Sequence, residues 1–173
     1  NERFKAGYLN KFPGYYFSGD GGFEDTDDYI YITGRVDDVI NVAGHRLSTA
    51  EMEEIVASHH SVAECAVIGI NDELKGQIPL ALVVAKSGED IEHFQLQHEV
   101  VHLVREQIGA VASLRDVVIV QRLPKTRSGK ILRKMMRSIA DGEQFQIPST
   151  IDDEAIIDEI REVLEHARIG CFK

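Results

Sequence analysis

A run of basic residues that contains no acidic residue occupies positions 122–137. Its cations are Arg122, Lys125, Arg127, Lys130, Arg133, Lys134 and Arg137. The solvated face of a helix accounts for the last three. Lys130 differs, because it follows Ser128-Gly129 on a turn at the expected start of a helix, where a cation and free N–H groups together suit an anionic oxygen. The turn is not a Walker-type phosphate loop, since Pro124 and Ile131 stand where that pattern requires Gly and Ser or Thr.

Two further segments near the N-terminus combine glycines with charged residues. Residues 14–22 read Gly-Tyr-Tyr-Phe-Ser-Gly-Asp-Gly-Gly, and residues 32–40 read Ile-Thr-Gly-Arg-Val-Asp-Asp-Val-Ile. A hairpin turn explains the glycines of the first, and a solvated ion pair explains the charges of the second. Alternatively, the two acceptor oxygens of Asp20 could bind a diol such as a ribose, and Arg35 could present a fixed guanidinium to a phosphate or ribose. The residues alone leave both interpretations open.

Residues 98–102 read His-Glu-Val-Val-His, which matches the H-E-x-x-H helix of zinc proteases. At 100° per residue, the apolar residues of this helix gather on one side, and His98 and His102 lie roughly opposite. We expect both histidines to face solvent near Arg105, whose charge repels a dication, and no third ligand is evident. A zinc hydrolase therefore ranks last among the functions considered, and no metal site is expected.

The elements that must position these groups alternate irregularly between strand and helix. Apolar and β-branched stretches predict strands at residues 15–17, 29–33, 39–42, 46–47, 62–70, 78–85 and 117–120. Helices are expected at residues 49–59, 91–108, 130–139 and within 148–173. A capping box, Ser48-Thr49-Ala50-Glu51, opens the first helix, and the glycines of residues 18–22 are expected to form the tight part of the first hairpin. This order predicts an α+β domain around a small sheet.

Composition confines the protein to ordinary globular classes. The chain has 173 residues, of which 43% are hydrophobic, and its 19 basic and 29 acidic residues give a net charge of −10. This charge argues against a dedicated nucleic-acid binder, and the longest apolar run, residues 78–85, is far too short to cross a membrane. Two cysteines, Cys65 and Cys171, cannot form a disulfide framework and fit a reducing compartment. Because the chain opens on Asn1 without Met, we expect a fragment.

Taken together, the motifs resemble the C-terminal part of an AMP-forming acyl-CoA synthetase of the short-chain (acetyl-/propionyl-CoA synthetase) family, within the adenylate-forming superfamily. They occur in the family's order: Ser18-Gly19-Asp20, Gly34-Arg35-Val36-Asp37-Asp38, Val42-Ala43-Gly44-His45-Arg46 and Pro124-Lys125-Thr126-Arg127-Ser128-Gly129-Lys130. The resemblance covers residues 14–139 and extends to 148–153. It implies a small mixed β-sheet flanked by helices, preceded by a hairpin. Residues 1–36 would end the N-terminal adenylation core, 37–146 would form a mobile lid, and 147–173 a tail with an amphipathic helix.

The resemblance implies a ligase that uses ATP and CoA in two steps. A carboxylate attacks the α-phosphate of ATP to give acyl-AMP and pyrophosphate, and the CoA thiol then displaces AMP. Mg²⁺ would be bound with ATP, mainly by the core, which this chain lacks. Lys130 matches the family's catalytic lysine, which stabilises charge at phosphorus. Asp20 matches the carboxylate on the ribose hydroxyls, Arg35 the arginine near ribose and phosphate, and Asp37 the hinge about which the lid turns.

After this rotation, the resemblance implies that residues 43–46 line the CoA tunnel. Gly44 would let the pantetheine arm pass close to the backbone, and Arg46 and Arg105 match positions that contact CoA. Ala43 stands where many acetyl-CoA synthetases carry Ser, so a hydroxyl contact to CoA is lost. This departure and the tail favour a propionyl- or short-chain-preferring enzyme over a strict acetyl-CoA synthetase.

The resemblance also implies partners and a compartment. The N-terminal adenylation domain of the same chain would complete the active site, so the fragment alone is expected to be inactive. Acetylation would remove the charge of Lys130, which predicts a lysine acetyltransferase and a deacylase as partners. No nucleic-acid or membrane partner is expected, and the family occurs in the mitochondrial matrix and the cytoplasm. The alternative from another class is a non-catalytic regulatory or binding module derived from the lid.

Overall fold

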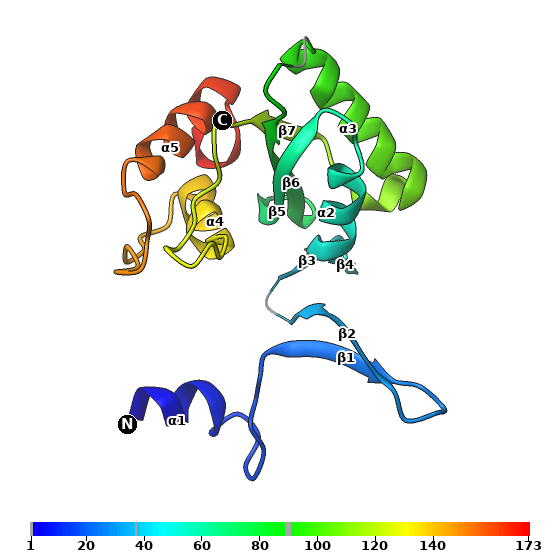
Figure 1. Cartoon of the computed structure of the whole chain (residues 1–173), viewed down its shortest axis with the longest axis vertical. Helices are drawn as coiled ribbons and strands as arrows, with labels where there is room; N and C mark the ends of the chain where they lie inside the picture. The colour runs from blue at the N-terminus through cyan, green and yellow to red at the C-terminus, as the bar shows by residue number, and fades with distance from the viewer. Residues whose placement is uncertain (1, 37, 89–90) are drawn as a thin grey trace. The chain divides into compact units, whose positions relative to one another are not determined.

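The computed structural model describes all residues except 1, 37, 89 and 90, and it divides into two compact units, Asn1–Val39 and Ile40–Lys173. Each unit is described by itself (Figure 1). The first contains α1 (Glu2–Tyr8), β1 (Asp20–Glu24) and β2 (Ile30–Arg35). The chain continues with β3 (Val39–Val42), β4 (His45–Ser48), α2 (Thr49–Ala57), β5 (Val62–Asp72), β6 (Gly76–Ala85), α3 (His93–Gln107), η1 (Ala110–Ala112), β7 (Asp116–Ile119), α4 (Arg133–Asp141), α5 (Ile156–Ala167) and η2 (Gly170–Phe172).

The hairpin of the first unit is displaced from its expected place. Sequence reasoning put the first strand at residues 15–17 and the turn at 18–22, and this was wrong. Gly21 and Gly22 lie inside β1, where a Cβ on Gly22 would lie 2.7 Å from a backbone carbonyl oxygen of β2. The turn comes later, because the Asp25 carboxylate accepts a hydrogen bond from the N–H of Tyr29 at 3.0 Å. Glycine here serves close strand approach rather than chain reversal.

The second unit is built on a five-stranded mixed sheet. Its strand order is β4-β3-β6-β5, and β7 also pairs with β6. Strands β5 and β6 form a long antiparallel hairpin, and β7 runs parallel to β6, with Asp116 opposite Leu80. The expected α+β fold around a small mixed sheet is confirmed.

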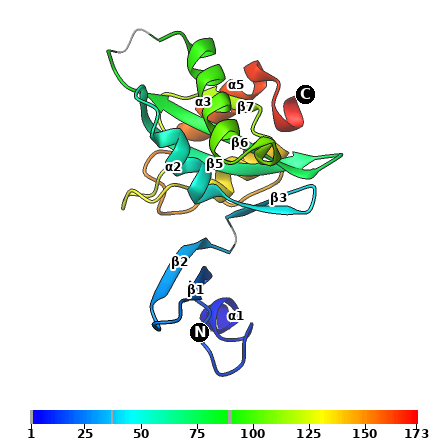
Figure 2. The same ribbon diagram turned by 90° about the vertical axis from the view of Figure 1, so that its right-hand side faces the viewer.

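The side chains of β6 alternate between two buried clusters, because successive residues of a strand point to opposite faces. Leu80 and Leu82 pack with α4 and α5, whereas Ala81 and Val83 pack with α2 and α3. The helices therefore cover both faces of the sheet (Figure 1 and Figure 2). Burial on both faces explains the continuous apolar run at 78–85. Helix α4, which follows the Lys130 loop, and helix α3 therefore pack against opposite faces of the sheet.

The C-terminal segment is an integral part of this unit. Ile156, Ile160 and Leu164 of α5 are buried in the cluster that contains Leu82. The apolar isoleucine and leucine stripe of this amphipathic helix therefore packs against the sheet.

The expected helix starts were right for α2 and wrong for α4. The Ser48 hydroxyl accepts a hydrogen bond from the N–H of Glu51 at 3.4 Å, as the capping box predicts. Helix α4 begins at Arg133 rather than at residue 130. An isolated β-bridge between Lys125 and Ile131 holds the chain extended just after Lys130, so the helix starts later.

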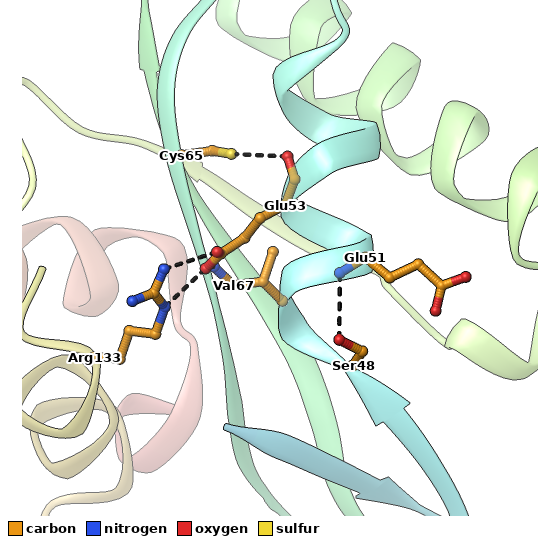
Figure 3. A network of polar contacts seen from close by, with 6 residues as sticks. All are labelled: Ser48, Glu51, Glu53, Cys65, Val67 and Arg133. Atoms are coloured by element: carbon orange, nitrogen blue, oxygen red, sulfur yellow. Dashed lines mark hydrogen bonds and ion pairs between the residues drawn. The ribbon is translucent and has the colours of Figure 1, made fainter. Parts of the chain in front are cut away.

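A polar network ties α2 to α4 around the edge strand β5 (Figure 3). Arg133 donates to both carboxylate oxygens of Glu53, at 2.9 and 2.7 Å, and Glu53 also accepts from the N–H of Val67 at 2.8 Å. The two side chains are only 26% and 16% exposed. Bidentate guanidinium–carboxylate pairs of this kind are strong and geometrically specific. Burial raises the pKa of the adjacent Cys65 thiol to about 11 and keeps it protonated.

Replacing Glu53 by glutamine is expected to lower the free energy of unfolding by about 2 kcal/mol, because a shielded guanidinium loses its charged partner. Urea unfolding of the 173-residue chain measures this loss. Glu51→Gln is the matched control, since Glu51 lies on the exposed side of the same helix, and it is expected to change stability by less than about 0.5 kcal/mol. Equal losses of stability in the two variants would contradict the contribution assigned to the Glu53–Arg133 ion pair.

Candidate functional site

Lys130 ends a tight loop that Thr126 organises. The backbone N–H of Thr126 donates to the Lys130 carbonyl at 2.9 Å, and its hydroxyl accepts from the Lys130 N–H at 3.1 Å. Its carbonyl accepts from the N–H of Gly129 at 2.8 Å. Gly129 has φ +83°, a conformation that favours glycine. The loop is thus closed by its own hydrogen bonds, and it leaves the Lys130 side chain exposed.

Acids from elsewhere in the fold neutralise most of the basic run around Lys130. The ion pairs are Arg122 with Asp153 and Glu159, Lys125 with Glu64, Arg133 with Glu53, and Arg137 with Asp141. Arg133, expected on a solvated helix face, therefore lies in a shielded pair instead. Within the part of the chain that the structure describes, Lys130 has no ion-pair partner, and its exposed ammonium group is available to an anionic ligand.

Asp20 and Arg35 face each other across the hairpin of the first unit. They are register partners in β1 and β2, and Nη1 of Arg35 lies 3.5 Å from Oδ1 of Asp20. The same Nη1 donates to the carbonyl of Ser18 at 2.8 Å. Gly19 has φ +82°, and a Cβ there would lie 2.6 Å from Nη2 of Arg35, so a side chain at this position would collide with the guanidinium. A carboxylate and a guanidinium thus share one end of the hairpin, where together they can bind a diol and a phosphate.

The residue expected to act as the hinge, Asp37, lies outside the described residues.

Ala43 and Gly44 form the two-residue turn that joins β3 to β4. Their φ angles are +49° and +89°, which is the pattern of a type I′ hairpin turn. The turn stands in open space, because a Cβ on Gly44 would meet no atom within 4 Å beyond its two chain neighbours. Arg46 is exposed on the following strand. The backbone of this turn is therefore accessible to an elongated ligand.

A basic pocket of about 290 Å³ lies where α3 ends, and Lys75, Arg105, Ser113 and Arg115 are among its lining residues. Nζ of Lys75 lies 2.8 Å from Oγ of Ser113. The carbonyl of Lys75 also accepts from the N–H of Ala43 at 2.8 Å. The structure thereby connects the turn and the Arg105 pocket, two of the regions expected to bind the same ligand.

Sequence reasoning missed Lys75 and Arg115 as members of this site. Both residues read as ordinary surface cations, and only the approach of β3 to β6 and the position of β7 bring them beside Arg105. No local signal in the sequence reports such long-range pairing.

The His-Glu-Val-Val-His segment lies on α3 with its histidines outward, as expected. His98 and His102 are exposed, and the pattern's Glu99 accepts a hydrogen bond at 2.8 Å from His59, whose side chain is 8% exposed. Hydrogen bonds from Gln95 and His59 lower the pKa of Glu99. Across the described ranges 2–36, 38–88 and 91–173, no group of three or more His, Cys, Asp or Glu side chains is placed to hold a metal ion. No helix among the same residues is long and apolar enough to cross a membrane.

Comparison with protein families gives a match to the AMP-binding enzyme C-terminal domain over residues 51–130. An uncharacterized protein of Pseudomonas aeruginosa is 61% identical over 97% of this chain, which is 27% of that protein. Human mitochondrial acyl-CoA synthetase short-chain family member 3 is 48% identical over 96% of the chain and 24% of its own length. Acetyl-coenzyme A synthetase of Penicillium chrysogenum is 48% identical over 97% of the chain and 25% of its own length. The chain thus spans about a quarter of these relatives.

Two solved structures are also similar to this chain. The amide bond synthetase McbA from Marinactinospora thermotolerans matches with a TM-score of 0.66 and 28% identity, over 79% of this chain and 27% of that one. The ATP-bound MatB from Rhodopseudomonas palustris matches with a TM-score of 0.66 and 27% identity, over 79% of this chain and 26% of its own.

Proposed function

The chain belongs to the AMP-binding enzyme C-terminal domain family and corresponds to the C-terminal part of short-chain acyl-CoA synthetases, and we propose that the whole protein joins a short carboxylic acid to CoA while it cleaves ATP. In the first step a carboxylate oxygen attacks the α-phosphorus, and the bond to pyrophosphate breaks. In the second the CoA sulfur attacks the acyl carbon, AMP leaves, and the thiol proton passes to solvent. Acetate and propionate are the proposed acids, with Mg²⁺ arriving on ATP.

Lys130 is the proposed catalytic residue of the first step. Negative charge grows on the phosphoryl oxygens as the carboxylate attacks, and a preorganised cation stabilises that charge. The exposure of Lys130 and the ion pairs of its neighbours support this role. The compact ammonium on a flexible stem can contact the carboxylate and the α-phosphate together.

Asp20 and Arg35 are the proposed nucleotide ligands. The carboxylate of Asp20 offers two acceptors to the ribose hydroxyls, and the guanidinium of Arg35 is held beside it by the Ser18 carbonyl. This support fixes the donor directions of Arg35 before the nucleotide arrives.

The observation that carries the two-step proposal is the placement of the candidate residues about the sheet of the second unit. Lys130 precedes α4, which packs against one face, and Arg105 lies in α3, which packs against the other. A single orientation of this unit cannot turn both faces toward one active site. We therefore propose that the unit rotates between the steps, with Asp37 as the hinge, so that Lys130 leaves as the turn at Gly44 enters.

The Arg105 pocket is the proposed binding site for the phosphates of CoA. Lys75, Arg105 and Arg115 line it, and such a group of cations suits a ligand with several phosphates. The hydrogen bond from Ala43 to the Lys75 carbonyl connects this pocket to the turn at Gly44, which the pantetheine arm would pass.

The exposed apolar surface of the first unit supports the proposal of a partner domain. Its described residues contribute no buried hydrophobic side chain to the core, which begins at Ile40, whereas Tyr15, Tyr29, Ile30 and Ile32 are more than 60% exposed. We propose that an N-terminal adenylation domain covers this surface and that residues 1–36 are its end, with residues 37–146 as the lid and 147–173 as its tail. A lysine acetyltransferase and a deacylase acting on Lys130, and a mitochondrial or cytoplasmic location, complete the proposal.

The full-length protein is expected to form AMP, pyrophosphate and acyl-CoA from ATP, CoA and acetate or propionate. Separate assays of the three products with acetate, propionate and butyrate test this and rank the acids. The 173-residue chain alone is expected to form no thioester, since residues 1–173 include only a quarter of the relatives' length. A full-length protein that consumes no ATP with any of these acids would favour the binding-module alternative.

A further inference from the structure

A segment of the C-terminal tail lies directly against the Lys130 loop. Thr126 and Ile151 form an antiparallel β-bridge. On one side of it the N–H of Arg127 donates to the carbonyl of Thr150 at 2.9 Å, and on the other the N–H of Asp152 donates to the carbonyl of Lys125 at 3.0 Å. Residues 150–152 thus pair with the backbone of residues 125–127, on the side of this strand opposite the loop's own hydrogen bonds. The match to the family's C-terminal domain ends at residue 130, before this segment begins.

Two anchors hold the segment in place. The side chain of Ile151 is buried in the cluster that contains α4 and α5. Arg122, which precedes the loop, lies 2.8 Å from a carboxylate oxygen of Asp153 and also pairs with Glu159 of α5. Hydrogen bonds from Arg122 lower the pKa of Glu159, so its carboxylate stays charged at neutral pH. The tail is therefore tied to both the core and the base of the loop.

We propose that residues 150–153 are a positioning clamp for Lys130, which hold its loop in the geometry that acyl-adenylate formation requires. The loop's internal hydrogen bonds all converge on Thr126, and the clamp fixes that residue from the opposite side. A catalytic cation displaced by about 1 Å can lose about 10²-fold in rate, so a loop with one free side is a poor support. The clamp acts through Lys130 and therefore rests on the proposed function.

Asp152→Pro in the full-length enzyme removes the N–H that donates to Lys125, because proline has no backbone donor. Asp152→Ala keeps that donor, and the Asp152 side chain is exposed, so it is the matched control. We expect Asp152→Pro to slow ATP–pyrophosphate exchange by about 10- to 100-fold, with thioester formation from supplied acyl-AMP within about twofold of wild type. Amide hydrogen exchange at Arg127 and Gly129 is expected to accelerate in the proline variant alone.

The outcomes separate the clamp from the proposed function. A wild-type enzyme without pyrophosphate exchange contradicts the function, whereas an active wild type with equal rates in both variants overturns the clamp. Equal losses in the two half-reactions also overturn it, since they indicate general damage. If Asp152→Pro does not fold, Arg122→Gln is compared instead with the control variant Arg161→Gln, which loses only an exposed ion pair with Asp158 on α5. Selective loss of adenylation in Arg122→Gln supports the clamp, and its absence overturns it.

Discussion

Replacing Lys130 by alanine in the full-length enzyme is expected to slow acyl-adenylate formation by about 10²- to 10³-fold, the usual cost of removing one preorganised group that stabilises transition-state charge. Thioester formation from supplied acyl-AMP is expected to stay near the wild-type rate, because the proposed rotation takes Lys130 out of the site before that step. Pyrophosphate exchange measures the first reaction, and CoA-dependent release of AMP from acyl-AMP measures the second.

Lys134→Ala is the matched control for this prediction. Lys134 carries the same charge, is exposed on α4, and has no ion-pair partner among the residues that the structure describes. Loss of general positive charge would affect both variants alike, whereas a specific role affects only Lys130. Near-wild-type rates for Lys130→Ala in both half-reactions would falsify its assignment.

The elements of the second unit were largely predictable because their signals are local. Residues 65–70 and 78–83 of the two apolar runs are buried on both faces, so their composition indicates strands. Ser48 caps α2 through a contact three residues away. Where the decisive contact lies outside the motif or element itself, prediction failed. The glycines of β1 are required by the approach of β2, and the start of α4 is delayed by the bridge from Lys125 to Ile131.

The candidate site shows the same difference between what local sequence reveals and what only the fold reveals. Lys130, Asp20 and Arg35 stand in short motifs, and a motif can be read without knowledge of the fold. The contacts around the Lys130 loop cannot be read in this way. The β-bridge to Thr126 comes from Ile151 in the tail, and the partner of Arg133 is Glu53 on another helix. Sequence therefore indicated which groups could perform the chemistry, whereas the structure adds which contacts hold them in position.

The proposed rotation makes the turn at Gly44 a test of the second step alone. Gly44→Leu in the full-length enzyme is expected to slow thioester formation by about 10²-fold, a typical cost of a misplaced reactant, while adenylation falls no more than a few-fold. The isobutyl group would occupy the open space around the turn, where no atom beyond the adjacent residues lies within 4 Å of the position that a Cβ would take, and the proposed path of the pantetheine arm needs that space. Pyrophosphate exchange against acyl-CoA yield measures the two steps separately.

Backbone strain must be separated from side-chain bulk before this result can be interpreted. Gly44 has φ +89°, and any residue with a Cβ is strained there by about 1–2 kcal/mol. Gly44→Ala carries that strain with little bulk, so it is the matched control. If bulk blocks the tunnel, the alanine variant keeps most of its thioester activity and the leucine variant loses it. Equal thioester losses in both variants would instead assign the effect to the turn conformation, and equal loss of both half-reactions would make the turn purely structural.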